Sequence, residues 1–345
     1  VYRLGLGHRY GRLMQTIAGI HYNFSVPDQL WQELQAASGD KQSLQDFKTQ
    51  GYFATIRNFR RYSWLLLYLL GAAPAVCKSF VRGREHQLQP VGDDSHSLYT
   101  PYATSLRMGD LGYQSEAQSS LIVCYNDLDQ YVRTLRSALE QPYPPYDEIG
   151  LKDQQGNYKQ LNTALLQIEN EFYSSIRPKR TTEMGETPIH ALQERGVEYI
   201  EVRCIDLNPL VPSGIDAETI RFLDTFLLFC LLQDSPDTNN EEYARIPENN
   251  LRTVYQGRDP SLMLIYGLRS PDFKIYDNSN NMNSEIYGAS KAAIIQITKY
   301  FAVLLAKKNI IVNCISPGGL KNKNFQKSKF ISNYSKKVPL GRMCK

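Results

Sequence analysis

The sequence contains no long hydrophobic run. Its longest nearly apolar stretch, "WLLLYLLGAAPAVC" at residues 64–77, is 14 residues long and includes a proline. A helix that crosses a bilayer needs about 20 apolar residues, so this stretch predicts a buried helix that ends near Gly71. No secretory leader is visible, and because the first residue is valine rather than methionine, we expect the natural start to lie upstream.

Paired cysteines and internal repeats are missing as well. The six cysteines lie far apart without a CxxC pair, and the five histidines are equally scattered. This spacing excludes the common zinc-site patterns. We therefore expect a reduced, cytoplasmic protein with free thiols.

The modest net charge of +4 hides a break in composition near residue 260. Residues 261–345 hold 12 Lys and 2 Arg against 3 acidic residues, whereas residues 1–260 hold 25 basic against 32 acidic residues. A basic tail is typical of binding to nucleic acid or an anionic membrane. These lysines, however, alternate with a regular apolar pattern, and a bias toward Lys and Asn also reflects the base composition of a different gene. We interpret the tail as a fused segment of foreign origin.

Hydrophobic periodicity predicts a mixture of strands and helices. Strands are expected at residues 18–26 and 196–207. Helices are expected at 28–38 (with Asp28 as N-cap), 60–71, 127–140, 216–236 and 286–307, the last followed by a buried strand. Irregular structure is expected at 76–120, a proline-rich turn at 142–150, and a polar loop at 235–250.

Two of these segments carry polar residues at alternating positions. Period two places Tyr199, Glu201 and Arg203 on one face of "EYIEVR", where a carboxylate and a guanidinium could serve a metal ion and a phosphate together. The plainer interpretation is a cross-strand salt bridge on a solvated face. "HYNFS" similarly aligns His21 and Asn23 with Ser25, although a lone histidine in a strand is more often structural than catalytic.

A basic segment follows a pair of acidic residues. "YSSIRPKR" gathers Arg177, Lys179 and Arg180 around a proline that forbids regular helix, so we expect a rigid loop suited to a polyphosphate or an ordinary surface loop. The preceding "QIENEFY" places Glu169 and Glu171 on one face together with Tyr173. Paired carboxylates beside a basic loop are typical of a magnesium–nucleotide site.

Considered in order, five segments form a longer pattern: "RYGRLMQTIAGIHYNFS", "RYSWLLLYLLGAAPAVCKSF", "PYATSLRMGDLGYQS", "LQIENEFYSSIRPKR" and "RGVEYIEVRCIDLNPLVPSGID". Together they resemble the proteobacterial glutamate–cysteine ligase family over residues 1–264. The resemblance implies an α+β fold with a glutamine-synthetase-like antiparallel sheet and helices. It also implies ATP-dependent ligation of the glutamate γ-carboxylate to the cysteine amine through a γ-glutamyl phosphate, the first step towards glutathione.

The resemblance also implies roles for individual residues. His21 and Glu201 fall on positions of ligands to Mg²⁺ or Mn²⁺, and Arg203 falls where a catalytic arginine faces the transferred phosphate. The positions that shape the amino-acid pockets are Tyr2, Arg107, Tyr113 and Tyr173. A nucleotide-binding role for the basic segment at 177–180 is our own inference. The implied partners are L-glutamate, L-cysteine and ATP, bound by a monomer without nucleic acid or membrane.

Departures from that family concern the two ends of the match. Family members carry an earlier segment with a Glu-rich motif that supplies more metal ligands, and they continue well beyond "GRDPSL". We therefore expect residues 1–264 to be truncated at both ends and ligation to be impaired. Production of γ-glutamylcysteine by the purified chain, absent in Glu201→Ala, would contradict this expectation.

A second pattern begins after the composition break. Tyr287 and Lys291 lie four residues apart on one helix face, where an ammonium favours the phenolate of a general acid–base. YxxxK alone is a common chance pattern, but the following "NIIVNCISPGG" makes residues 265–345 resemble the C-terminal half of a short-chain dehydrogenase/reductase. The resemblance implies a partial α/β Rossmann-type segment in which residues 317–319 would approach a nicotinamide.

This second resemblance lacks the parts that bind a dinucleotide. "GLGHRYG" at residues 5–11 follows no strand and belongs to the first match, and Leu264 stands where the family has its catalytic serine. We therefore expect no binding of NAD(P). The join near Leu264 has no linker, which favours a remnant spliced by recombination or by an error of sequence assembly. The alternatives are an NAD(P)-dependent oxidoreductase completed by another chain, an inactive chimeric product, and a non-enzymatic binding module that uses the basic tail.

Overall fold

The computed structural model describes residues 1–112, 116–119, 121–259 and 331–332. The chain divides into two compact units, residues 1–262 and 263–345, and almost all described residues belong to the first. The helix and strand predicted after residue 286 lie outside the described residues, as do Tyr287 and Lys291. Within the described ranges no helix is both long enough and apolar enough to span a bilayer.

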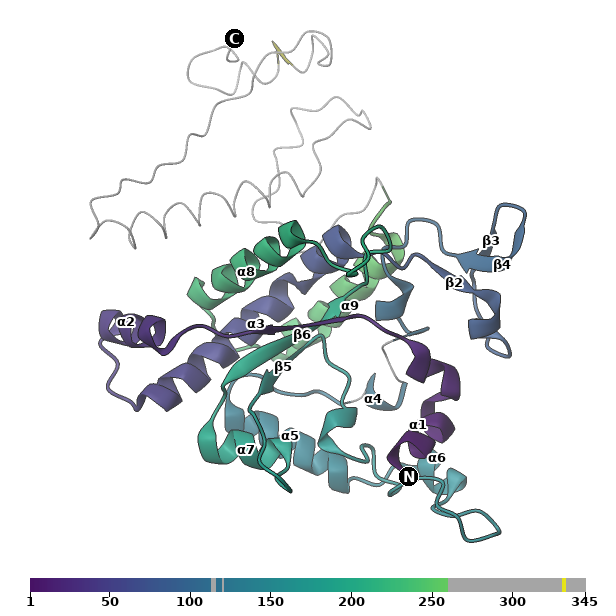
Figure 1. The fold of residues 1–345 in the computed structure, drawn as a ribbon, viewed down its shortest axis with the longest axis horizontal. Helices are drawn as coiled ribbons and strands as arrows, with labels where there is room; N and C mark the ends of the chain where they lie inside the picture. The colour runs from purple at the N-terminus through teal and green to yellow at the C-terminus, as the bar shows by residue number, and fades with distance from the viewer. Residues whose placement is uncertain (113–115, 120, 260–330, 333–345) are drawn as a thin grey trace. The chain divides into compact units, whose positions relative to one another are not determined.

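A 27-residue helix, α3 (Leu44–Leu70), lies at the centre of the first unit (Figure 1). Ser43 caps its start by accepting a hydrogen bond from the backbone N–H of Asp46, and the helix ends before Gly71. The predicted end is confirmed, but the predicted start at residue 60 is wrong by 16 residues. The buried polar side chains Arg57 and Asn58, which donate to backbone carbonyls of other segments, interrupt the apolar pattern of the first half.

The helices α2 (Asp28–Ser38), α8 (Ala217–Leu232) and α9 (Asn240–Gln256) make the most extensive helix contacts with α3. The first two were predicted, although Asp28 is the first helical residue of α2 and Pro27 is its N-cap. The prediction of a polar loop at 235–250 is wrong. Asn239 caps α9 and the helix continues through Pro247, because its apolar side chains are buried against the core.

The main sheet has three antiparallel strands in the order β1–β6–β5, with bounds β1 (Ile20–Phe24), β6 (Tyr199–Ile205) and β5 (Ile176–Lys179). The predicted strands around β1 and β6 are confirmed. β5 was predicted as a loop because of Pro178. Among the described residues β5 pairs with β6 alone and so is an edge strand, and an edge strand tolerates a proline that cannot donate to the ladder.

The two faces of this sheet differ in chemistry. On one face the fully buried Ile176, Ile200 and Val202 pack toward α3. On the other face Glu201 of β6 has Asn23 of β1 as its neighbour on one side and Arg177 of β5 on the other. The register therefore gathers polar residues from three strands on the face that points away from α3.

The remaining elements surround this frame. The helices are α1 (Tyr2–Tyr10), α4 (Glu116–Ser119), α5 (Leu128–Glu140), α6 (Pro144–Ile149) and α7 (Pro188–Arg195). A second antiparallel sheet, in the order β2–β4–β3, consists of β2 (Ala75–Cys77), β4 (Asp94–Tyr99) and β3 (Gln89–Val91). Short 3₁₀ helices lie at Arg12–Thr16, Lys78–Val81, Leu106–Met108 and Glu169–Glu171.

These elements settle three earlier predictions. The helix predicted at 127–140 is confirmed as α5, capped by Asp127. The stretch 76–120 was predicted as irregular but contains the second sheet, and the turn predicted at 142–150 contains α6, which starts with a proline in its first turn. The combination of helices with small antiparallel sheets confirms the α+β fold class.

Candidate functional site

Three predicted site residues meet on the polar face of the main sheet. The Nδ1 atom of His21 lies 3.4 Å from Oε1 of Glu201, and Nε of Arg203 lies 3.7 Å from the other carboxylate oxygen. Arg203 Nε–H also donates to Nε2 of His21 at 3.5 Å. The structure therefore brings the predicted metal ligands and the predicted catalytic arginine together. These three residues, His21 of β1 with Glu201 and Arg203 of β6, are called the charged group on β6 below.

The protonation of His21 suits a ligand role. Partial burial lowers the pKa of its imidazole, and the positive charge of Arg203 lowers it further, whereas Glu201 opposes both effects. A neutral imidazole keeps the lone pair that a metal ion requires. His21 is 49% exposed in its side chain, so solvent and ligands can reach it.

The same residues can be tested for their fit to a divalent cation. No cluster of three or more His, Cys, Asp or Glu side chains suited to a metal occurs in the part of the chain that the structure describes. His21 and Glu201 would supply two ligand atoms. This number fits Mg²⁺ or Mn²⁺, since such ions in nucleotide sites commonly have one or two protein carboxylates and take their remaining ligands from phosphates and water.

Two cations of β5 adjoin this group on the same face. Arg177 is buried, and its Nη2 donates to the carbonyl of Asn170 at 3.2 Å, while its Nε has no hydrogen-bond partner. Burial lowers the pKa of Lys179, and the positive charges of Arg177 and Arg203 lower it further against the opposing effect of Glu201. Cations held this close together, one with an unused donor, favour a bound anion.

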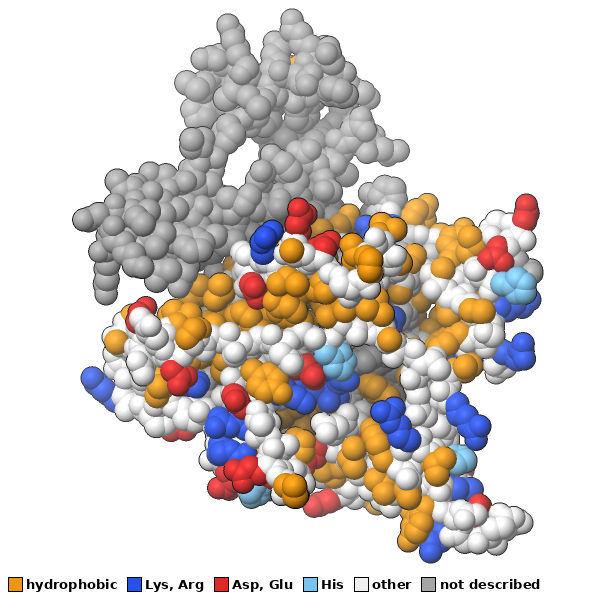
Figure 2. Space-filling model, viewed as in Figure 1, with side chains coloured by type: hydrophobic (Ala, Val, Ile, Leu, Met, Phe, Trp, Pro, Cys, Tyr) orange, Lys and Arg blue, Asp and Glu red, His pale blue; other side chains and the backbone are white. Residues whose placement is uncertain are grey.

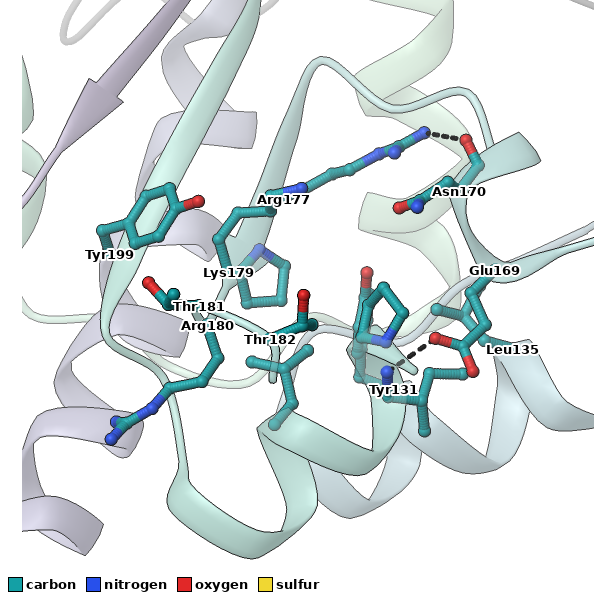
Figure 3. Close-up of a pocket in the computed structure, with 14 residues that line it drawn as sticks. Tyr131, Leu135, Glu169, Asn170, Arg177, Lys179, Arg180, Thr181, Thr182 and Tyr199 are labelled. Carbon is teal, nitrogen blue, oxygen red and sulfur yellow. Dashed lines mark hydrogen bonds between the residues drawn. The ribbon is translucent and has the colours of Figure 1, made fainter. Parts of the chain in front are cut away.

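A cavity of about 330 Å³ lies beside β5 (Figure 3). It extends from β5 to α5 and α7, and its lining combines apolar, hydroxyl and basic side chains: Tyr131, Leu135, Glu169, Asn170, Arg177, Pro178, Lys179, Arg180, Thr181, Thr182, Pro188, Ile189, Leu192 and Tyr199. The three basic residues predicted to bind a nucleotide all belong to this lining. A volume above 300 Å³ is typical of small-molecule sites.

Arg180 is nevertheless oriented differently from Arg177. Its guanidinium points away from that residue in Figure 3, donates to the carbonyl of Arg195 at 2.7 Å, and lies 3.9 Å from the carboxylate of Glu198. The basic segment is therefore not a single cluster, and Arg177 and Lys179 are its members that face the charged group on β6.

The predicted pair of carboxylates does not form a metal site. Glu171 is fully buried and forms an ion pair with Arg9 at 3.2 Å, and it also accepts a hydrogen bond from the hydroxyl of Tyr10. Glu169 accepts from the backbone N–H of Ile189 at 2.6 Å. A 3₁₀ helix at Glu169–Glu171 directs the two side chains to different partners, so the period-two expectation for this stretch is wrong.

The residues predicted to shape the amino-acid pockets lie around the same sheet. Burial raises the pKa of the Tyr2 phenol; the charge of Glu171 raises it further, while Arg177 and Arg203 lower it. Because Arg203 is close enough to affect this pKa, α1 lies near the charged group. Arg107 reaches the carbonyl of Arg203 at 3.4 Å. Tyr113 lies outside the described residues.

Tyr173 approaches from another direction. Its ring packs edge-on against Tyr10 with 5.8 Å between centroids, and its backbone N–H donates to the side chain of Gln118. Tyr2 of α1 and Arg107 of the 3₁₀ helix at Leu106–Met108 thus lie near the charged group on β6, whereas Tyr173 contacts Tyr10 of α1. Figure 2 shows basic, acidic and histidine side chains gathered over the strands on this face.

Sequence reasoning missed several residues of the site. Tyr131, Asn170, Thr181 and Thr182 line the cavity, but their residue types carry no local signal of ligand binding. Asp206 is a buried carboxylate that binds Arg107, and a signal for it existed in the sequence. An acidic residue within the apolar end of a predicted strand requires a partner once it is buried.

Comparison with known proteins shows which family the chain resembles. A glutamate–cysteine ligase family model matches residues 1–254. The glutamate–cysteine ligase of Saccharophagus degradans is 62% identical over 264 residues, covering 76% of this chain and 50% of that protein. That of Pseudomonas aeruginosa strain UCBPP-PA14 is 55% identical over 278 residues, covering 81% of this chain and 52% of that protein.

Two solved structures are also similar to this chain. The crystal structure of the Francisella tularensis glutamate–cysteine ligase in complex with AMP matches with a TM-score of 0.70 at 40% identity, covering 76% of this chain and 51% of that one. A bifunctional glutathione synthetase from Pasteurella multocida matches with a TM-score of 0.52 at 25% identity, covering 77% of this chain and 29% of that one.

The C-terminal residues match a different model. A family described as enoyl-(acyl carrier protein) reductase matches residues 275–345, in line with the reductase-type resemblance of that segment. The chain spans about half the length of the curated ligases that it matches. Because the ligase model matches well over half of the 345 residues, the chain belongs to the glutamate–cysteine ligase family.

Proposed function

We propose that residues 1–259 form the nucleotide- and amino-acid-binding part of an ATP-dependent ligase. The reaction joins the γ-carboxylate of L-glutamate to the amine of L-cysteine through a γ-glutamyl phosphate, the first step of glutathione synthesis. One observation carries the proposal. The register of three strands gathers His21, Glu201 and Arg203 beside Arg177 and Lys179, at the edge of a cavity large enough for part of a nucleotide.

The charges suit phosphoryl transfer to a carboxylate. That reaction brings a polyphosphate against an anionic acceptor, so its transition state requires fixed positive charge. Arg203 would neutralise the transferred group, and Arg177 with Lys179 would hold the remaining phosphates. A divalent cation bound by Glu201 and His21 would supply additional charge neutralisation. Arg107 would bind a carboxylate of an amino-acid substrate, because a guanidinium matches a carboxylate with two parallel hydrogen bonds.

The nucleotide part of the proposal is tested by calorimetric titration with magnesium-ATP. Replacing the buried guanidinium in Arg177→Gln is expected to raise the Kd for magnesium-ATP by about tenfold or more, which corresponds to roughly 1.4 kcal/mol for one charge-assisted contact. Arg221→Gln is the matched control, since it removes an exposed arginine from α8. An equal Kd for both variants and the unaltered chain would contradict the assignment of this cavity to ATP.

The chemical part is tested with labelled cysteine. Because the chain spans about half the length of its relatives, we expect γ-glutamylcysteine formation to be impaired or absent. Any release of phosphate from ATP that depends on glutamate should be lost in Glu201→Gln. Turnover that persists in Glu201→Gln would exclude the charged group on β6 as the reaction site.

We also propose that the protein acts in the cytoplasm as a monomer on small molecules alone. The four described cysteines, Cys77, Cys124, Cys204 and Cys230, are all free thiols, which suits a reducing compartment. Sedimentation velocity at micromolar protein should give a single species of 39.5 kDa. A dimeric mass, or a shift in mobility with DNA at physiological salt, would contradict this proposal.

A further inference from the structure

A buried ion pair fixes the side chain of Arg107. Its Nε atom lies 2.6 Å from Oδ1 of Asp206, and the two side chains are only 9% and 3% exposed. Arg107 belongs to the 3₁₀ helix at Leu106–Met108, and Asp206 directly follows the last residue of β6. The pair therefore connects a predicted substrate-binding residue to the strand that carries Glu201 and Arg203.

The carboxylate of Asp206 is itself held by two other groups. The hydroxyl of Ser105 donates to Oδ1 at 3.1 Å, and the backbone N–H of Ala72, just after α3, donates to Oδ2 at 2.8 Å. With both oxygens engaged, the carboxylate has one orientation. Its acceptance of the Arg107 Nε–H consequently fixes the plane of the guanidinium as well as its position.

A close approach by the backbone confines the guanidinium from the opposite direction. A Cβ atom at Gly19 would lie 2.7 Å from Cζ and Nη1 of Arg107 and 2.9 Å from the carbonyl oxygen of Ile205. Only glycine leaves room for the guanidinium there. Since Gly19 directly precedes β1, the Arg107 head group lies between the start of β1 and the end of β6, two residues from His21.

We propose that Asp206 and Gly19 are positioning residues for Arg107. They hold its guanidinium so that it can bind the carboxylate of an amino-acid substrate next to the charged group on β6. The identity of the bound carboxylate rests on the proposed ligase function, whereas the positioning of Arg107 does not. A purely structural ion pair would instead connect the two segments without influencing ligand binding.

The positioning is tested first without any ligand, by ¹⁵N-detected NMR of arginine Nε–H groups in the full chain. The Arg107 signal is identified by its loss in Arg107→Lys. Asp206→Asn removes the charge but keeps an acceptor, and Gly19→Ala displaces the guanidinium with the ion pair intact. We expect the Arg107 signal to shift or broaden in both variants and to stay unchanged in Asp153→Asn, which alters an exposed turn carboxylate. An unchanged signal in both variants would overturn the inference.

Binding of L-glutamate and of magnesium-ATP then separates positioning from general damage. Calorimetry should show an L-glutamate Kd at least tenfold higher in Asp206→Asn and Gly19→Ala, with the magnesium-ATP Kd within twofold of the unaltered chain. Equal weakening of both ligands would indicate a structural role only. If the unaltered chain does not bind L-glutamate, the proposed function fails, and the NMR result still decides the positioning. Should Asp206→Asn not fold, Gly19→Ala alone decides both measurements.

Discussion

Two glutamates of the first unit, Glu171 and Glu201, lie in very different environments. Glu171 is paired with Arg9 across 162 residues and is fully buried, whereas Glu201 lies on the partly exposed polar face of the sheet, 3.7 Å from Arg203. Alternation in the sequence was sufficient to place Glu201 and Arg203 on one face. It could not place Glu171, because the partner that determines its burial lies far away in the chain and has no local signature.

Removing the charge of Glu171 should destabilise the fold strongly. In Glu171→Gln the guanidinium of Arg9 keeps its charge at a fully buried position without a counterion. Such a change typically lowers the free energy of unfolding by about 3–5 kcal/mol. Urea unfolding followed by circular dichroism should show this loss. Glu248→Gln is the matched control, because its exposed pair with Arg252 on α9 contributes at most about 0.5 kcal/mol. Similar losses for both variants would contradict the buried-pair account.

The carboxylate of Glu186, just before α7, should make stability depend on pH. Hydrogen bonds from Arg195, from the backbone of Glu183 and from His190 lower its pKa from 4.5 to about 2. A lowered pKa stabilises the fold above pH 4.5, and this contribution disappears as the pH falls toward 2. The Tm of Glu186→Gln should therefore lie below that of the unaltered chain at pH 6, and the gap should narrow below pH 4.5.

The control for this pH series is Glu194→Gln, which changes an exposed glutamate on α7. Its Tm difference from the unaltered chain should stay nearly constant between pH 6 and 3.5. A gap for Glu186→Gln that does not change with pH would show that the Arg195 contact contributes nothing to folding.

Whole elements were predictable where one pattern dominated. β1, β6, α5 and α8 follow clean periodicities, and each was placed from the sequence. β5 and α9 were not, because each contains a proline and local rules then predict a break. An edge position accommodates Pro178, and burial of the apolar side of α9 outweighs the cost of Pro247.

The packing of α2 on α3 depends on one glycine. A Cβ atom at Gly51 would lie 2.4 Å from Cζ3 of Trp31, a rigid and fully buried ring. Overpacking costs about 1–3 kcal/mol, while replacing a helical glycine by alanine returns up to ~1 kcal/mol. Gly51→Ala should therefore lower the free energy of unfolding by about 1 kcal/mol. It should also change the near-UV circular dichroism of tryptophan. The control is Gln50→Ala, which changes a neighbouring exposed residue and should alter neither the stability nor the spectrum. If Gly51→Ala were more stable and its spectrum unaltered, Trp31 would be able to move aside.

At the scale of the whole molecule, the chain combines two family matches with different ligand expectations. Residues 1–254 match a ligase model and residues 275–345 a reductase model. The composition break in the sequence lies between them, which made this division visible without any structure. The order of motifs also made the ligase match predictable, whereas the cavity beside β5 depends on how three distant segments meet.

Ligands should discriminate between the two matches in a thermal unfolding experiment. A ligand that binds only the folded state raises the midpoint, by the equivalent of about 2.7 kcal/mol at 100 times its Kd. Magnesium-ATP with L-glutamate should raise the Tm of the chain, and this rise should be reduced in Arg177→Gln. NADP at the same concentration should leave the Tm unchanged. A rise with NADP would contradict the expectation that the reductase-type segment binds no dinucleotide.

The pairing of β1 with β6 has a consequence for how the protein is made. His21 and Arg203 are 182 residues apart, so the partner strand that β1 has among the described residues is absent until β6 has left the ribosome. At about 5–20 residues per second, that wait is roughly 10–35 s. During this time α3 is already synthesised, but the sheet face that covers its apolar side does not yet exist. Nascent chains of this length should therefore depend on chaperones that bind exposed apolar surface, and the dependence should end only after α8 and α9, which also pack on α3, have emerged.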